Sequence, residues 1–124
     1  MKARILYIED NESNMYLVTY ILQSRGHEVL QAWDGAEGVD LARSALPDLI
    51  LLDIQLPGMN GYETARRIRA ESELAGIPMV ALTSYAMAGD QEKALGAGCN
   101  GYIEKPINPD TFVAQIEAFL TTAQ

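Results

Sequence analysis

Short continuous runs of hydrophobic residues alternate along the chain with longer stretches in which hydrophobic residues recur at helical spacing. Runs of the first kind are typical of strands that are buried on both faces of a parallel sheet. They are Ile5–Ile8, Val29–Leu30, Leu49–Leu52, Met79–Leu82 and Tyr102–Ile103. The amphipathic stretches between and after them predict helices near 13–24, 35–45, 61–71, 90–97 and 109–121.

Glycine and proline residues mark the ends of these predicted elements. Gly26 is expected to end the first helix and Pro47 to stop the second, while Asn108 and Pro109 are typical of a helix start. Strict alternation of strand and helix indicates a parallel sheet with right-handed crossovers and helices on both faces. We therefore expect a doubly wound, flavodoxin-like α/β fold of five parallel strands in the order 2-1-3-4-5, forming one domain over residues 1–124.

Charge and composition narrow the possible partners and compartment. The chain of 124 residues carries nine Lys and Arg against seventeen Asp and Glu, which gives a net charge of −8. This excess of negative charge disfavours binding to nucleic acid or to an anionic membrane surface. No hydrophobic run approaches the ~20 residues that span a bilayer. The single cysteine, Cys99, excludes a disulfide within the chain, and we expect a cytoplasmic protein.

Polar residues follow four of the five predicted strands. Glu9 and Asp10 come after the first strand, Asp53 after the third, Thr83 after the fourth and Lys105 after the fifth. The carboxyl ends of parallel strands meet at one edge of the sheet, and ligands bind there at the point where the strand order reverses. We therefore expect three carboxylates, a hydroxyl and an ammonium group to converge on one site.

This combination of groups indicates phosphoryl transfer to a carboxylate. Clustered carboxylates repel one another unless a cation neutralises them, and Mg²⁺ prefers such oxygen ligands. Asp53, at the end of a buried strand, is the expected nucleophile and would form an acyl phosphate. Lys105 is expected to pair with a phosphate oxygen, and Thr83 to donate a hydrogen bond to another oxygen. Movement of the Thr83 loop would then act as a switch.

Four motifs carry a resemblance to a known family: Ile8–Asn11, Leu52–Gly61, Ala81–Ser84 and Tyr102–Pro106. In their order and spacing they resemble the CheY-type receiver domain of two-component response regulators, and the likeness covers nearly the whole chain. The stretches Met59–Arg69 and Tyr85–Asp90 are similar to stand-alone DivK-like regulators and to the receivers of hybrid histidine kinases.

The resemblance implies a role for each residue of the acidic site. Asp53 corresponds to the residue that accepts the phosphoryl group. Glu9 and Asp10 correspond to the acidic pair that holds Mg²⁺, with Asp10 as the expected direct ligand and Asp53 as a further member of the metal site. Gln55 corresponds to the position that binds the metal through its backbone carbonyl, so that its side chain can vary.

The resemblance also implies a conformational switch and a set of partners. Thr83 corresponds to the switch hydroxyl, and Tyr102 to an aromatic side chain that turns inward when Thr83 moves. Lys105 corresponds to the phosphate-binding lysine, and its peptide bond to Pro106 is expected to be cis. The phosphoryl donor would be a histidine kinase or a histidine phosphotransferase, and the signal would pass on through a downstream protein partner rather than through DNA or a membrane.

Three alternative functions are considered beside this hypothesis. A phosphatase of the haloacid dehalogenase type would need a second aspartate where Gln55 stands, and an amide cannot carry the proton. A flavin or nucleotide binder would need a glycine- or hydroxyl-rich loop after the first strand, where Glu9 and Asp10 lie instead. A receiver that binds partners without phosphorylation is disfavoured because every residue that phosphorylation requires is present.

Five further residues are expected to take no part in this chemistry. His27, the only histidine, is expected at the surface, so that the donor histidine must come from a partner. Arg66, Arg67 and Arg69 are expected to form the solvated face of the third helix. Cys99 is expected to fill space as a small hydrophobic residue.

Overall fold

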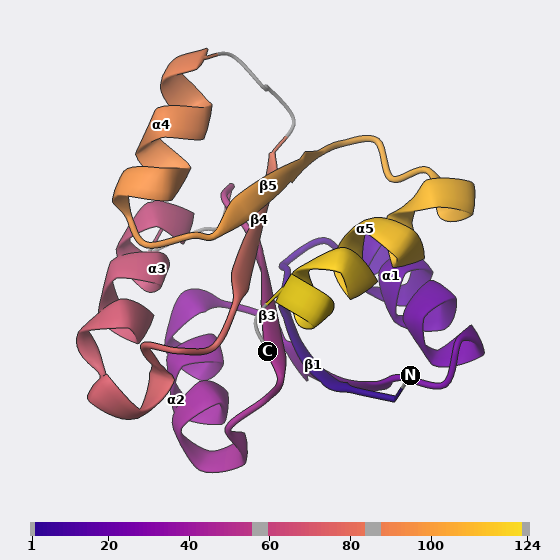
Figure 1. Ribbon diagram of the computed structural model, residues 1–124, viewed down its shortest axis with the longest axis horizontal. Helices are drawn as coiled ribbons and strands as arrows, with labels where there is room; N and C mark the ends of the chain where they lie inside the picture. The colour runs from indigo at the N-terminus through magenta and orange to yellow at the C-terminus, as the bar shows by residue number, and fades with distance from the viewer. Residues whose placement is uncertain (1, 56–59, 84–87, 123–124) are drawn as a thin grey trace.

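Strands and helices alternate throughout the computed structural model, which describes residues 2–55, 60–83 and 88–122 (Figure 1). The strands are β1 (Arg4–Ile8), β2 (Glu28–Ala32), β3 (Leu49–Asp53), β4 (Met79–Thr83) and β5 (Gly101–Glu104). The helices are α1 (Glu12–Ser24), α2 (Gly35–Ala45), α3 (Gly61–Ala70), α4 (Ala88–Gly96) and α5 (Pro109–Thr122), with a short 3₁₀ helix at Ser72–Leu74.

The five strands form one parallel sheet in the order β2-β1-β3-β4-β5, which confirms the predicted fold. The order reverses at β1, because this strand pairs with β2 on one side and with β3 on the other. The register brings Ile8 opposite Leu52, and Thr83 opposite Glu104. The residues at the carboxyl ends of β1, β3, β4 and β5 therefore meet at one edge of the sheet, beside the reversal.

Helices cover both faces of the sheet, with α1 and α5 on one side and α2, α3 and α4 on the other (Figure 1). Side chains of one strand alternate between the two layers. Ile5 and Tyr7 pack with α1 and α5, whereas Leu6 and Ile8 pack with α2 and α3. This alternation explains why β1 is a continuous hydrophobic run: both of its faces are buried.

The boundaries of the elements differ from the predictions by only a few residues. The second strand extends from the predicted pair to Glu28–Ala32, and the last predicted strand extends to Gly101–Glu104. The 3₁₀ helix has no counterpart among the predicted elements. No helix in the described parts of the chain is long and apolar enough to cross a membrane.

His27 corrects one expectation, because the structure buries it. The residue is 3% exposed, and its Nδ1 accepts a hydrogen bond of 3.1 Å from the backbone N–H of Ala3. With Nδ1 as the acceptor, the ring proton lies on Nε2, which donates to Glu117 on α5 over 2.9 Å. The ring thus ties the turn before β2 to the residue that precedes β1 and to α5. Sequence position alone did not reveal this, because the partner is 90 residues away.

Arg69 is a second correction. Arg66 and Arg67 are exposed as expected, but the Arg69 guanidinium donates hydrogen bonds to the carbonyls of Leu74 and Gly98 and to the side chain of Asn100. It therefore joins α3 to the turn between α4 and β5, and the residue is only partly exposed. Cys99, in that turn, is a buried free thiol as expected.

Candidate functional site

Three carboxylates gather at the sheet edge beside the strand reversal, as predicted. Glu9 and Asp10 follow β1, and Asp53 ends β3. One carboxylate oxygen from each lies within 4.8 Å of those of the other two. Glu9 and Asp53 are buried and Asp10 is exposed, so the cluster opens to solvent on the side of Asp10.

Asp53 is held between a cation and a backbone donor. Its Oδ2 lies 3.2 Å from the Lys105 ammonium nitrogen, and its Oδ1 accepts a 3.0 Å hydrogen bond from the backbone N–H of Gln55. The side chain is almost fully buried, at 4% exposed. Each oxygen of this buried carboxylate therefore has a partner that stabilises its negative charge.

The loop after Asp53 begins in a fixed conformation because α3 packs closely against it. A Cβ atom on Gly61, the first residue of α3, would lie 2.4 Å from the Cα atom of Ile54. The Gly61 N–H also donates to the Ile54 carbonyl over 3.0 Å. Only glycine permits this approach, so Gly61 helps to fix the chain where Gln55 lies.

Lys105 reaches two of the carboxylates from the end of β5. Its ammonium nitrogen lies 3.5 Å from Glu9 Oε1 as well as 3.2 Å from Asp53 Oδ2. Its backbone N–H donates to the Thr83 carbonyl over 2.7 Å, which anchors the lysine to the end of β4. The peptide bond from Lys105 to Pro106 is cis, as the resemblance implies.

Glu9 is fully buried, and its carboxylate is surrounded by donors and by another acid. Oε1 accepts a 2.7 Å hydrogen bond from the Tyr7 hydroxyl, and Oε2 accepts a 3.3 Å hydrogen bond from the Asn11 backbone N–H. Burial raises the pKa of Glu9 to about 7, and hydrogen bonding with Asp53 acts in the same direction. The Tyr7 hydroxyl and the charge of Lys105 oppose that rise.

Tyr7 is a member of the site that the hydrophobic pattern does not reveal. The run Ile5–Ile8 predicts only a buried strand, and Tyr7 lies within it. A buried tyrosine hydroxyl needs a hydrogen-bond partner, and residues two apart on a strand face the same side. The spacing of Tyr7 and Glu9 is the sequence signal from which this contact could have been inferred.

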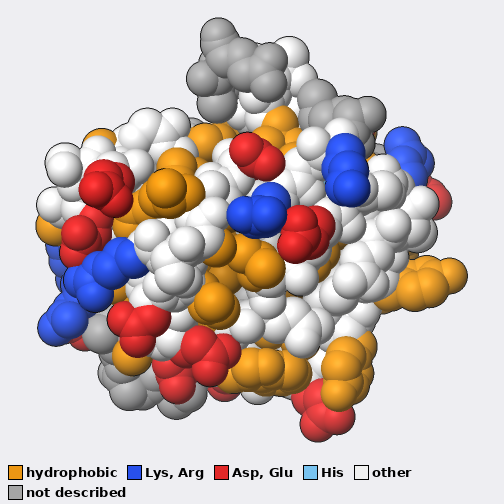
Figure 2. All heavy atoms as spheres, turned by 90° about the horizontal axis from the view of Figure 1, so that it is seen from below, with side chains coloured by type: hydrophobic (Ala, Val, Ile, Leu, Met, Phe, Trp, Pro, Cys, Tyr) orange, Lys and Arg blue, Asp and Glu red, His pale blue; other side chains and the backbone are white. Residues whose placement is uncertain are grey.

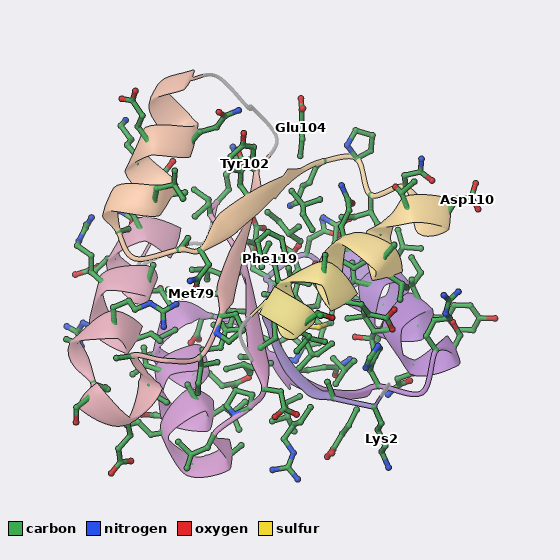
Figure 3. All side chains as sticks on the ribbon, viewed as in Figure 1. Lys2, Met79, Tyr102, Glu104, Asp110 and Phe119 are labelled. Atoms are coloured by element: carbon green, nitrogen blue, oxygen red, sulfur yellow. The ribbon has the colours of Figure 1, made fainter. Side chains whose placement is uncertain are left out.

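Thr83 and Tyr102 occupy neighbouring strands behind the acidic cluster. Thr83 ends β4 and is buried, whereas Tyr102 on β5 is 37% exposed. Ile103 packs toward α1 and α5, so Tyr102 and Glu104 face the layer that contains α4. Figure 3 shows Tyr102 on that side of β5 and Phe119 of α5 on the other. The motif residues Leu56 to Met59 and Ser84 lie outside the described residues.

The donor set fits a small divalent cation. Three carboxylates lie close together. Among the described residues, Lys105 is the one whose ammonium group forms ion pairs with them, one with Glu9 and one with Asp53. Hard oxygen ligands of this kind suit Mg²⁺, which usually keeps several water molecules in its shell. Glu9, Asp10 and Asp53 are therefore the residues that could hold it, and the open side at Asp10 could admit solvent.

The charge on the molecular surface is mixed. On the face shown in Figure 2, acidic and basic side chains lie interspersed with hydrophobic ones. That face therefore has no continuous basic surface, among the side chains the structure describes, of the kind that tracks a nucleic-acid backbone.

Comparison with known proteins identifies the family to which this site belongs. Residues 5–117 match the family described as the response regulator receiver domain. The chain is 41% identical over 123 residues to the polar-differentiation response regulator DivK of Brucella anthropi, with 99% of this chain and 100% of that protein covered.

Solved structures of receiver proteins have the same fold. One is the receiver domain of the sensor histidine kinase PA1611 from Pseudomonas aeruginosa, which was solved with a magnesium ion coordinated in its active site cleft. It matches this chain with a TM-score of 0.90 and 34% sequence identity, and the match covers 98% of this chain and 99% of that one. The chemotaxis response regulator CheY4 of Vibrio cholerae matches with a TM-score of 0.91 and 29% sequence identity, and the match covers 96% of this chain and 99% of that one. The chain belongs to the family of response regulator receiver domains, whose role in signalling is to accept a phosphoryl group.

Proposed function

We propose that Asp53 accepts a phosphoryl group from a phosphohistidine on a histidine kinase or a histidine phosphotransferase. The observation that carries the proposal is the contact of 3.2 Å between Asp53 Oδ2 and the Lys105 ammonium, inside a cluster of three carboxylates. A carboxylate in this setting is held in place as a nucleophile, because the Lys105 ammonium and the Gln55 backbone N–H each bind one of its oxygens.

In the proposed step a carboxylate oxygen of Asp53 attacks the phosphorus atom of the donor. An oxygen–phosphorus bond forms while the phosphorus–nitrogen bond breaks, and the imidazole of the donor leaves with the electron pair of that bond. Lys105 then pairs with an oxygen of the acyl phosphate in place of the Asp53 carboxylate it contacts now. The buried histidine of this chain is not a candidate donor, because His27 is bound to Ala3 and Glu117.

Mg²⁺ belongs to the proposal as the cofactor, and when bound it supplies positive charge that offsets the charge of the transferring phosphoryl group. Asp10, the exposed member of the cluster, is the residue that we expect to bind it directly. Glu9 and Asp53 hold further oxygens beside that position, and the Gln55 backbone carbonyl is proposed as the remaining protein ligand. The short loop from Asp53 to Gln55 brings that residue close to the cluster.

Phosphorylation is proposed to switch the surface that partners read. The phosphoryl group adds about −1.5 to −2 charge and new acceptor oxygens at Asp53. Thr83 moves toward them to donate its hydroxyl, and Tyr102 turns from its half-exposed position into the space that Thr83 leaves. The surface formed by α4 and β5 then changes, which a downstream protein partner can recognise as a shift between two conformations.

The proposal makes the chain a signal carrier that catalyses only its own phosphorylation and slow dephosphorylation. Gln55 supports this, because an amide two residues after Asp53 cannot act as the acid and base of a phosphatase. We further propose that residues 1–124 form one domain that acts in the cytoplasm. Cys99 is consistent with a reducing compartment, since it is a free thiol.

The experiment that tests the proposal measures the mass of the intact protein after incubation with phosphoramidate and Mg²⁺. The wild-type protein should gain one phosphoryl group, and it should gain none when EDTA removes the metal. Asp53→Asn should gain none. Asp48→Asn is the matched control, because Asp48 lies just before β3, at the opposite end of the strand. Full labelling of Asp53→Asn would overturn the proposal.

A further inference from the structure

Tyr7 joins the hydrophobic core to the acidic site. The residue lies in β1, which is hydrogen-bonded to β2 on one side and to β3 on the other. Its ring is fully buried in the layer covered by α1 and α5. Its hydroxyl donates to Glu9 Oε1 over 2.7 Å, which is shorter than the contacts of that carboxylate with Lys105 and with the Asn11 backbone N–H. A hydroxyl on such a rigid support has little freedom to move.

Two other partners of the Glu9 carboxylate, Lys105 and Asn11, lie farther from it than the Tyr7 hydroxyl does. Oε1 has the Lys105 ammonium at 3.5 Å, and Oε2 has the Asn11 backbone N–H at 3.3 Å. A buried carboxylate that loses a donor keeps the full cost of its desolvation. Without the Tyr7 hydroxyl, the Glu9 carboxylate would therefore have to turn, or Lys105 would have to move closer to Oε1.

Lys105 connects this contact to the nucleophile. Its ammonium lies 3.2 Å from Asp53 Oδ2 but 3.5 Å from Glu9 Oε1, although both carboxylates are buried. The hydrogen bond from Tyr7 occupies Oε1 and reduces the pull of Glu9 on the lysine. The hydroxyl thus affects both the acid of the metal cluster and the cation beside Asp53.

We propose that Tyr7 is a positioning residue of the phosphoryl-acceptor site: its hydroxyl fixes the Glu9 carboxylate in the acidic cluster and thereby leaves Lys105 against Asp53. This inference rests on the proposed function, since it concerns the binding of Mg²⁺ and the reaction at Asp53. The competing explanation is that Tyr7 serves the core only through its ring, and in that case its hydroxyl would have no effect on the site.

The test compares wild type, Tyr7→Phe and the matched control Ile5→Val by isothermal titration with Mg²⁺. Phenylalanine keeps the ring and removes only the hydroxyl. Ile5 is buried in the same layer as Tyr7 and on the same face of β1. The substitution Ile5→Val therefore removes one methyl group from that layer and leaves the Tyr7 hydroxyl and Glu9 in place. We expect Tyr7→Phe to raise the dissociation constant for Mg²⁺ by about tenfold, as is typical when a residue that orients a metal ligand is lost. Ile5→Val should leave it unchanged.

Phosphorylation by phosphoramidate provides a second readout that a purely structural role would not change. For Tyr7→Phe the Mg²⁺ concentration that gives half of the maximal rate should rise. The double variant, Tyr7→Phe with Glu9→Gln, shows whether the hydroxyl acts through Glu9. If it does, Tyr7→Phe should have little effect on Mg²⁺ binding in a protein that already carries Glu9→Gln. An equal effect in both backgrounds would contradict the inference.

A folded Tyr7→Phe protein with the wild-type dissociation constant would overturn the inference and leave the proposed function intact. If instead the wild-type protein neither binds Mg²⁺ nor becomes phosphorylated, the proposed function itself is wrong. If Tyr7→Phe fails to fold, the inference can be tested by NMR on the wild-type protein. The protein is then labelled at the tyrosine ring carbon that bears the hydroxyl. The Tyr7 signal should move on addition of Mg²⁺, with the exposed Tyr20 as reference, and an unmoved Tyr7 signal would refute the inference.

Discussion

Glu9 should make the metal-free protein less stable as the pH rises. Its carboxyl is fully buried, and burial raises its pKa from 4.5 to about 7. Between these two values the folded state holds a proton that the unfolded state has already released, so a rising pH favours unfolding. The effect amounts to about 3 kcal/mol, because each tenfold change in proton affinity is worth ~1.4 kcal/mol.

Glu9→Gln removes the titrating group while it keeps a side chain of the same shape. The assay is urea unfolding in EDTA, followed by circular dichroism, at a series of pH values from 4.5 to above 7. The free energy of unfolding of the wild type should fall across this range by about 3 kcal/mol relative to Glu9→Gln. Glu73→Gln, at an exposed position, is the control and should follow the wild type.

Mg²⁺ adds a second arm to the same measurement. A cation at the acidic cluster favours the ionised form of Glu9, so saturating Mg²⁺ should restore most of the stability that the wild type loses at the upper end of the range. Glu9→Gln should gain less. Parallel curves for wild type and Glu9→Gln in EDTA would refute the reasoning, because they would show that Glu9 ionises alike in the folded and unfolded states.

Four further substitutions test other parts of the account. Asp10→Asn should raise the dissociation constant for Mg²⁺ by at least about tenfold, measured by calorimetry, because it removes the exposed carboxylate that we propose as the direct ligand. Thr83→Ala and Tyr102→Ala should leave phosphorylation of Asp53 nearly intact, but they should reduce the NMR shifts of the α4 amides induced by beryllofluoride. If Thr83→Ala shows the full wild-type shift pattern, the Thr83 hydroxyl does not couple the phosphorylated site to α4. His27→Ala should lower the free energy of unfolding by about 2 kcal/mol or more, measured in urea, because it leaves the buried Ala3 N–H without an acceptor.

The fold and the main members of the site were predictable because they depend on local patterns. A strand buried on both faces is a continuous hydrophobic run, and parallel strands carry the residues that follow them to one edge. Glu9, Asp53 and Lys105 therefore had to meet once the strand order was known. Their spacing in the structure, with Lys105 between the two acids, agrees with that expectation.

Contacts between layers were not predictable in the same way. His27 and Glu117 are 90 residues apart, and their hydrogen bond depends on how α5 packs beside the turn before β2. Arg69 likewise meets the Gly98 carbonyl only because α3 and α4 lie next to each other. The hydrophobic pattern gives the face that each helix buries, but it does not give the lateral position of one helix against its neighbour.

The central claim is that Asp53 is the residue that accepts the phosphoryl group. Its most direct test is borohydride reduction of the phosphorylated protein, which converts a phosphorylated aspartate to homoserine, followed by peptide mass spectrometry. We predict homoserine at position 53 in wild type after treatment with phosphoramidate and Mg²⁺, and at no other aspartate. Homoserine at Asp10 or at another aspartate, with Asp53 unmodified, would contradict the account.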